Sequence, residues 1–421
     1  MCALSARFCF HNVGQGGFYS GQINFAENNF TFVYDCGTLS PHKFVTDAIK
    51  KFSLSVEGEN ELDLLVLSHL DVDHVNGVSN LLEICKIRQI NVLVMPYMTL
   101  LDRTILLSYY AKRSLDDNSE WYYRFLIDPI GFFLTKDVSI NHIVFVSNSD
   151  NEYKGGDDDI LPFDDPECKF VGRENKGKEN NLRDEFYKIG RLTNRLYCVE
   201  NLKINYHGIW QFDFWCDCRR VRTDIYKKLI YEISKLGLNI NSIDSIIDIF
   251  DTKRKELAGC YGETRIAPND MSVTLLHYPI MECLSPNIDL EIMEPFAHGC
   301  LLSSACYPLV NACGNKTLLL GDINLKSTLD QILEYFNLID IENEILVCTV
   351  PHHGSSNSWN PEILNRCTET IFVVSSGIHG RFKHPHNDVV SDFKKNCNMP
   401  LLWNNEYSKI YISFYDENHS Y

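Results

Sequence analysis

The chain has 421 residues, of which 45% are hydrophobic and 23% are charged, and its formal net charge is −17. These proportions are typical of globular proteins and exclude a collagen-like, coiled-coil or wholly disordered chain. The acidity disfavours general binding to nucleic acid or to an anionic membrane, so a phosphate ligand must meet a local cation or a bound metal ion. The 16 cysteines are scattered. In a chain of this length without a signal-peptide pattern, scattered cysteines predict buried thiols and a cytoplasmic protein. The chain has no apolar run of about 18 residues, so we expect no membrane segment.

Residues 1–97 predict tightly packed α/β structure. Ser40-Pro41 indicates a helix start, because a capping hydroxyl followed by proline is favoured in the first turn. This helix is expected to run to about Phe52, and a second helix is expected after His74. The β-rich and apolar runs predict strands at 7–13, 18–25, 30–35, 62–68 and 91–95.

Residues 98–265 differ in composition, and we expect them to form an insertion subdomain. An acidic run at 156–167 and a charged, Asn-rich run at 172–185 predict solvated loops. The remaining patterns predict helices at 223–235 and 243–257 and a strand at 206–215.

Residues 266–421 return to alternating strands and helices. Residues capable of chemistry follow several of the strand ends, where open α/β architectures place ligands. Helices are predicted at 325–336 and 387–396, and strands at 271–277, 317–320, 344–350, 370–374 and 409–415.

The strongest chemical signal follows the apolar strand at 62–68. His69, Asp71, Asp73 and His74 lie within six residues. The first three can project to one side of an extended or turning segment, while His74 opens the following helix. Two imidazoles and two carboxylates at this spacing suit one or two divalent cations. The alternative is a capped strand-to-helix turn with exposed polar groups, but the combination favours the metal site.

Three weaker signals follow later strands. Asp322 ends Leu318-Leu-Leu-Gly-Asp, which leaves a carboxylate at the mouth of a strand, although Gly-Asp turns are common. The adjacent His352 and His353 follow a strand and precede a glycine, and because neighbouring side chains do not easily point the same way, one of them is expected to bind metal. His384 and His386 lie in a loop, where paired histidines are more often surface residues.

Taken together, these motifs resemble the metallo-β-lactamase superfamily, and within it the hydrolase branch of the DNA-uptake protein ComEC. The resemblance covers about 1–97 and 266–421 and leaves out the insertion. It implies an α/β fold, the αββα sandwich, in which two sheets lie back to back with helices outside and metals at one edge. The matching pieces are Val13-Gly-Gln-Gly16, Val33-Tyr-Asp-Cys-Gly37, Ser68-His-Leu-Asp-Val-Asp-His74, Asn269-Asp-Met-Ser272, Leu320-Gly-Asp322, and Pro351-His-His-Gly-Ser355 with His384-Pro-His386.

The resemblance also implies two divalent metal ions, Mn²⁺ or Zn²⁺, with Mg²⁺ not excluded. The superfamily's commonest pattern has histidine where Asp71 stands, whereas the ComEC-like branch has aspartate, which shifts the preference toward manganese or magnesium. The histidine usually contributed between the two halves is not identifiable, because Asn269 and Ser272 occupy its neighbourhood and His277 is expected to face the core. The implied ligands are His69 and Asp71 for the first ion, Asp73, His74 and His353 for the second, and Asp322 between them.

The predicted function is that of a two-metal phosphodiesterase or nuclease, in which a hydroxide shared by the cations attacks a phosphodiester of DNA or RNA. Asp73 is expected to bind metal and orient the hydroxide. His384 or His386 is expected to contact the phosphate or protonate the leaving group. The residues predicted to contact substrate are His352, Ser355, Asn269, Ser272, Arg381 and Lys383.

Two other functions stay open. A pocket closed by the insertion would favour a hydrolase of a small phosphoester, a cyclic nucleotide or a lactone. The insertion could instead bind a protein partner in a larger assembly without catalysis. Arg219, Arg220 and Arg222 would line a nucleic-acid groove if the insertion covers the metal edge, and would otherwise be a solvated helix start. Cys216 and Cys218 lack a second ligand pair, so we expect structural cysteines rather than a zinc site.

Overall fold

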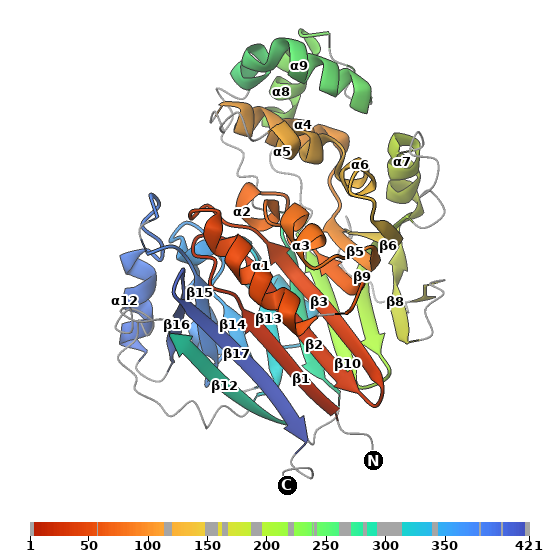
Figure 1. The fold of residues 1–421 in the computed structure, drawn as a ribbon. Coiled ribbons are helices and arrows are strands. Elements are labelled where there is room, and N and C mark those ends of the chain that lie inside the picture. Colours follow the sequence, from red (N-terminus) through yellow and green to blue (C-terminus); the bar gives the residue numbers. More distant parts are fainter. Residues whose placement is uncertain are drawn as a thin grey trace.

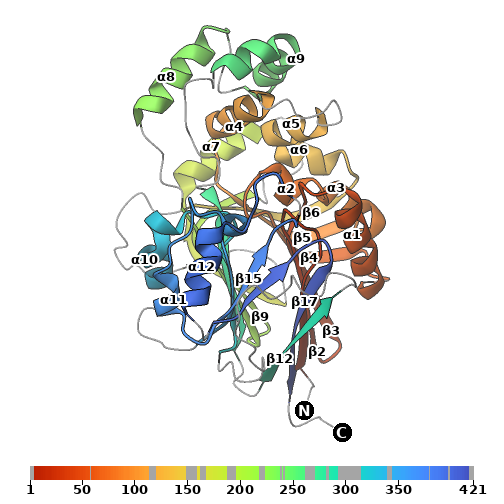
Figure 2. The same cartoon turned by 90° about the vertical axis from the view of Figure 1, so that its left-hand side faces the viewer.

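The strands form one continuous hydrogen-bonded ladder that folds into two sheets packed face to face (Figure 1, Figure 2). The first sheet has antiparallel strands at one end and parallel strands at the other. The computed structural model describes residues 4–56, 58–112, 120–147, 159–161, 167–186, 196–217, 223–237, 239, 242–260, 271–280, 284–292, 314–338, 344–378, 380–396 and 399–416.

The order of the first sheet follows from the strand pairing. Antiparallel pairs join β12, β17, β1, β2 and β3, and parallel pairs continue through β4, β5 and β6. The parallel strands are near-continuous apolar runs because helices and the second sheet cover both of their faces. The strands are β12 (Leu284–Ile292), β17 (Ser408–Asp416), β1 (Leu4–Phe10), β2 (Phe18–Phe25), β3 (Asn28–Cys36), β4 (Glu61–Val66), β5 (Gln89–Pro96) and β6 (Ser139–Val146).

The second sheet continues from β6 through the long strand β9, which first pairs with β6 and then with β10. From β10 the ladder runs through β11 and β13, and β13 to β16 are parallel. On the side, β8 pairs with β9, and β7 pairs with β8. The strands are β7 (Asp159–Ile160), β8 (Cys168–Glu174), β9 (Leu196–Tyr206), β10 (Trp210–Cys216), β11 (Val273–Pro279), β13 (Lys316–Leu319), β14 (Ile345–Thr349), β15 (Ile371–Ser375) and β16 (Leu401–Asn404).

Helices cover both outer faces of the sandwich (Figure 2). On the first sheet lie α1 (Lys43–Ser55), α2 (Val72–Val75) and α3 (Val78–Ile84), and on the second lie α10 (Leu325–Tyr335), α11 (Ile363–Arg366) and α12 (Asn387–Lys395). A further group lies beyond one end of the sandwich (Figure 1): α4 (Leu100–Lys112), α5 (Glu120–Ile127), α6 (Pro129–Leu134), α7 (Lys176–Phe186), α8 (Thr223–Ser234) and α9 (Ile243–Cys260).

Three hydrophobic layers separate the four layers of secondary structure. One lies between the two sheets and includes Phe8, Phe32 and Leu275. A second lies between the first sheet and its helices, and a third lies under α10, α11 and α12. Because each sheet buries both faces in this way, the αββα sandwich predicted from the sequence is confirmed.

The segment 98–265 contributes to the sandwich as well as to the outer helices. Its strands β6, β9 and β10 are part of the main ladder. The strand predicted at 206–215 is present as β10 over most of its length. Its start was placed too early, because His207 and Gly208, with φ of 48° and 71°, make a turn between β9 and β10. The run at 172–185 was predicted to be a loop, and this prediction is wrong: the run forms the end of β8 and most of α7, which buries Leu182 and Phe186. The division of the chain into three domains stays a prediction.

Two observations bear on the expected environment of the chain. Eight cysteines in the described part of the chain are buried, in line with the expected buried thiols. Among the described residues, no helix is long and apolar enough to cross a membrane.

Candidate metal centre

The carboxyl ends of parallel strands meet at one edge of the sandwich, and the motif residues follow them. β3 ends beside Asp35, and β4 leads into the segment 68–74. In the second sheet, β13 leads to Asp322 and β14 to His353. Strands of the same direction end at the same edge, so side chains distant in sequence come together there.

Close backbone packing fixes the motif loop after β4. Asp71 precedes the single turn of α2, and the His74 N–H donates to the Asp71 carbonyl at 3.0 Å. The loop lies directly against the end of β3, because a Cβ on Gly37 would lie 2.6 Å from the carbonyl of Asp73. The N–H of Gly77 donates to Cys36 at 2.8 Å. The sequence Asp-Cys-Gly at the end of β3 therefore holds the ligand loop in place.

Asp322 lies at the centre of four imidazoles. Its Oδ1 is 3.4 Å from Nε2 of His74 and 3.7 Å from Nε2 of His353. Its Oδ2 is 3.7 Å from Nε2 of His69 and 3.8 Å from Nε2 of His352. All four rings therefore present the same nitrogen to one buried carboxylate.

Each of these rings is held through its other nitrogen. This is the usual arrangement around histidines that bind metal, since a hydrogen bond to one nitrogen fixes the ring and leaves the lone pair of the other free to coordinate. The partners of Nδ1 are Ser68 Oγ for His69 (2.8 Å), Asp35 Oδ2 for His74 (2.8 Å), the Ser375 carbonyl for His353 (2.8 Å) and Ser358 Oγ for His352 (3.0 Å).

The donor set fits divalent cations. The Nε2 atoms of His69, His74 and His353 are buried and have no hydrogen-bond partner among the described residues. Buried polar atoms without partners are uncommon and need an explanation. Asp73 adds a carboxylate 3.1 Å from His353 Nε2, and the ligand atoms of Asp73, His74 and His353 all lie within 4.8 Å of one another. Buried imidazoles and carboxylates at this spacing can hold divalent metal ions.

The charges of the site are strongly coupled. Burial, Asp73 and Asp322 raise the pKa of Asp71 to about 7, although the Tyr110 hydroxyl hydrogen-bonds to that carboxylate. Burial and the neighbouring His74 lower the pKa of His69 to about 4, which keeps this ring neutral at neutral pH. Burial opposes ionisation of Asp322, but the surrounding histidines hold its pKa well below the usual range. Burial opposes protonation of His74 and His353, but Asp35 and Asp322 raise the pKa of His74 well above its usual value, and Asp322 and Asp73 raise the pKa of His353. The centre therefore combines an ionised carboxylate, the neutral ring of His69 and two imidazoles whose protons a bound metal ion would displace.

A second loop lies beside this cluster. The rings of His384 and His353 are stacked, with centroids 6.3 Å apart, and the rings of His384 and His386 are 4.7 Å apart. Gln15 donates to Nδ1 of His384 at 3.4 Å, and the Ser356 N–H donates to Nδ1 of His386 at 3.0 Å. In the neutral tautomers that accept these bonds, the proton lies on Nε2 of each ring. Burial, followed by His353 and His352, lowers the pKa of His384 to about 3, so that ring is a neutral N–H donor.

The remaining predicted substrate residues fall into three groups. Arg381 and Lys383 are exposed beside the second loop. Ser272 and Ser355 were expected to contact substrate but are buried, with 0% and 3% of their surface exposed, and the Ser272 hydroxyl accepts the N–H of Asp322 at 3.2 Å. Ser272 therefore contacts the backbone of Asp322, and the substrate contacts expected of Ser272 and Ser355 stay predictions. Asn269, Arg219, Arg220, Arg222 and Cys218 lie outside the described residues.

The adjacent histidines differ from the sequence expectation. Only one of them was expected to point into the site, but both reach Asp322. Consecutive left-handed conformations, with φ of 49° at His352 and 56° at His353, turn the backbone so that both rings face the same carboxylate. His277 does face the core as expected: it lies between Tyr19 and Trp210, with Nε2 2.9 Å from the Tyr19 hydroxyl.

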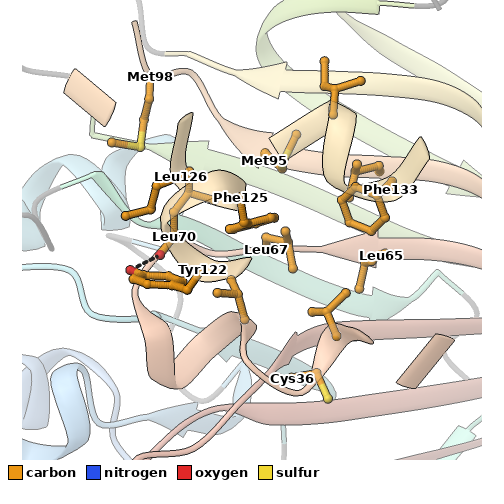
Figure 3. Close-up of a cluster of buried hydrophobic side chains, with 14 of the residues drawn as sticks. Cys36, Leu65, Leu67, Leu70, Met95, Met98, Tyr122, Phe125, Leu126 and Phe133 are labelled. Carbon is orange, nitrogen blue, oxygen red and sulfur yellow. Dashed lines mark hydrogen bonds between the residues drawn. The ribbon is translucent and has the colours of Figure 1, made fainter. Parts of the chain in front are cut away.

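Sequence reasoning assigned no role to two groups that contact the ligands. Asp35 belongs to a motif quoted for the resemblance, and its position after a strand was the available signal. Tyr110 lies on α4, outside every motif found in the sequence, so no sequence signal pointed to it. Tyr122 of α5 also reaches the loop, donating to the Leu70 carbonyl at 2.8 Å beside Phe125 and Leu126 (Figure 3). Helices α4 and α5 therefore close one side of the centre.

The two sheets pack back to back, and these side chains lie on the loops after their parallel strands. This arrangement is the αββα sandwich that the resemblance to the metallo-β-lactamase superfamily predicted. No protein-family model and no curated protein matches the sequence. Among solved structures, the chain is similar to a long-form RNase Z from yeast, with a TM-score of 0.35 and 10% sequence identity. The match covers 96% of this chain but 41% of the RNase Z chain, so this chain spans less than half of that protein's length.

Proposed function

We propose that the protein is a metal-dependent hydrolase that cleaves phosphodiesters of DNA or RNA with two divalent ions, Mn²⁺ or Zn²⁺. The observation that carries this proposal is the set of buried imidazole nitrogens around Asp322, which have no hydrogen-bond partner among the described residues. When bound, the ions would lower the pKa of a water molecule toward neutrality and neutralise charge on the phosphate. Mg²⁺ is a third candidate, because Asp71, Asp73 and Asp322 supply oxygen ligands.

Groups beside the centre support a phosphate as the substrate. The Nε2–H groups of His384 and His386 are donors that suit phosphate oxygens, and Arg381 and Lys383 supply positive charge next to them. Local cations matter in a chain of net charge −17, because the far field repels a polyanion. Asp73 would bind metal together with His353, since its Oδ2 lies 3.1 Å from Nε2 of that ring.

A second candidate is hydrolysis of a small phosphoester, a cyclic nucleotide or a lactone. The observation that favours it is the closure of one side of the centre by α4 and α5, through the bonds of Tyr110 to Asp71 and of Tyr122 to Leu70. A covered site admits a small ester more easily than a duplex. Binding of a protein partner through 98–265 and a cytoplasmic location stay predictions.

The test is hydrolysis by the purified full chain after chelation and reloading with Mn²⁺, Zn²⁺ or Mg²⁺. Substrates should include single- and double-stranded DNA, RNA, bis(p-nitrophenyl) phosphate, cyclic nucleotides and a lactone. We expect metal-dependent cleavage of nucleic acid that Asp73→Asn lowers by more than about 100-fold, since loss of a ligand exceeds the effect of losing a second-sphere partner. Asp63→Asn is the control, because Asp63 lies at the opposite end of β4 from the motif.

The outcomes separate the candidates. Faster turnover of cyclic nucleotides or lactone than of any nucleic acid would favour the small-substrate function. A chain that carries stoichiometric metal but cleaves no phosphodiester would refute the proposed phosphodiesterase. A cellular phenotype that survives Asp73→Asn would favour the partner-binding function, because that variant removes catalysis and leaves the residues 98–265 unchanged.

A further inference from the structure

We propose that His352 is a protein ligand of the first metal ion, in place of the histidine that cannot be identified between the two halves of the chain. The inference rests on the proposed metal centre and adds a ligand to it. The sequence alone assigned His352 to substrate binding, because only one of two adjacent histidines was expected to face the metals.

The first argument is that the two carboxylate oxygens of Asp322 face different pairs of imidazole rings. Oδ1 of this carboxylate faces His74 and His353, at 3.4 and 3.7 Å, and these rings belong to the second ion. Oδ2 faces His69 and His352, at 3.7 and 3.8 Å. If Asp322 bridged two ions through both of its oxygens, each ion would receive one oxygen, and the ring that shares Oδ2 with His69 would lie at the first ion.

The second argument is the way in which the His352 ring is held. Its Nδ1 lies 3.0 Å from the hydroxyl of Ser358, which is buried, just as Ser68, Asp35 and Ser375 hold the other three rings. The backbone N–H of His352 donates to the Gly321 carbonyl at 3.1 Å, directly beside Asp322. Its left-handed φ of 49° is uncommon for a residue with a side chain. Such conformations are retained mainly where a site requires them.

The third argument is the composition of the resulting site. Without His352, the first ion would receive one imidazole from His69 and carboxylates from Asp71 and Asp322. With it, each ion receives two imidazoles, one carboxylate of its own and one oxygen of Asp322. Two nitrogen ligands shift the preference of the first site from Mg²⁺ toward Mn²⁺ and Zn²⁺.

The experiment measures metal stoichiometry and affinity in the full chain, independently of activity. Chelated protein is dialysed against defined free Mn²⁺, and bound manganese is counted by elemental analysis and followed by electron paramagnetic resonance. We expect two ions per chain in the unmodified protein. His352→Ala should hold one ion at the concentration that gives two, with the affinity of the weakened site lowered more than about 10-fold. The control is His207→Ala, an exposed histidine in the turn after β9, which should keep both ions.

The possible results are distinguishable. If the unmodified chain binds two ions and His352→Ala binds both with unchanged affinity, the assignment is wrong and the proposed hydrolase stands. A raised KM for substrate with unchanged metal binding would likewise return His352 to substrate contact. If the unmodified chain binds no metal, the proposed function itself fails. If His352→Ala does not fold, the same measurement is made on Ser358→Ala, which keeps the imidazole but removes the hydroxyl that holds its Nδ1. A lowered metal affinity of the first site in this variant supports the assignment, and an unchanged affinity overturns it.

Discussion

Side chains at the centre are of two kinds: those that face Asp322, and those that hydrogen-bond to the first kind and hold them in place. That these side chains come together could be predicted from sequence, because four of them lie within six residues and the others follow strands beside glycines. The role of Asp35 could not be predicted from the sequence, because a single carboxylate at a strand end is common and its partner His74 lies 39 residues away. Asp35 accepts three bonds, from the backbone and hydroxyl of Ser68 and from His74 Nδ1, at 2.7, 2.6 and 2.8 Å.

Replacing Asp35 tests this supporting role. Asp35→Asn should lower the affinity of the site for Mn²⁺ by about 10- to 100-fold, because the amide no longer offers two anionic acceptors to His74 and Ser68. Competition with a fluorescent chelator measures the change. Asp63→Asn is the matched control: Asp63 also accepts a backbone N–H, from Thr31 at 2.7 Å, but away from the ligands. Equal affinities in the two variants would contradict the role given to Asp35.

Secondary-structure elements were predicted best where a pattern is local and strong. The parallel strands β4, β14 and β15 appear in the sequence as apolar runs of strand length. The polar helix α7 was missed because it buries few apolar side chains, and the start of β10 was placed too early because the turn at His207 and Gly208 is short. β12 was missed since Pro286 and Asn287 resemble a loop, although both pair with β17 in the structure. These elements are stabilised by tertiary contacts, and such contacts cannot be predicted from a short stretch of sequence.

Gly37 shows how one element constrains another. Gly37→Ala would place a Cβ 2.6 Å from the backbone of Asp73 and 2.8 Å from His74 N, so the ligand loop would have to move. We expect a loss of about 1–3 kcal/mol in the free energy of unfolding, as for other overpacked sites, together with weaker Mn²⁺ binding. Denaturant unfolding and metal titration measure the two effects.

Gly177→Ala is the control for this variant. Gly177 lies in α7, and an added Cβ would lie 3.7 Å from Oδ1 of Asn175, which is an ordinary contact distance. Because alanine favours a helix over glycine, we expect no loss, and a gain of up to about 1 kcal/mol. If Gly37→Ala behaved like Gly177→Ala, the close packing of the ligand loop on β3 would not constrain the centre.

At the scale of the whole molecule, the two sheets are joined by an aromatic core that contains the buried imidazole of His277. His277 of β11 lies against Phe8 and Phe32 of the first sheet and hydrogen-bonds to Tyr19. Burial lowers its pKa to about 3, compared with about 6.5 in an unfolded chain. Below about pH 6.5 the unfolded chain therefore binds a proton that the folded chain does not.

The stability of the sandwich should therefore fall in mild acid. The contribution of His277 to the free energy of unfolding is fully present above about pH 6.5 and declines by up to about 1.4 kcal/mol per pH unit toward pH 3. His277→Gln should show a smaller decline, while the exposed His207→Gln should follow the unmodified chain. Denaturant unfolding at several pH values measures the three slopes. Parallel curves for His277→Gln and the unmodified chain would show that this imidazole does not contribute.

The pairing of β1 with β17 has a consequence for the order of events during translation. Ser5 pairs with Tyr415, and Asp322 meets His69 and His74 across a shorter but still long stretch of chain. The first ligand motif therefore leaves the ribosome long before the carboxylate that completes it. Contacts of such sequence separation form slowly, and unpaired strand edges are open to aggregation until they form. A nascent chain would thus hold β1 and the first ligands without partners, and the metal centre would assemble among the last events of folding.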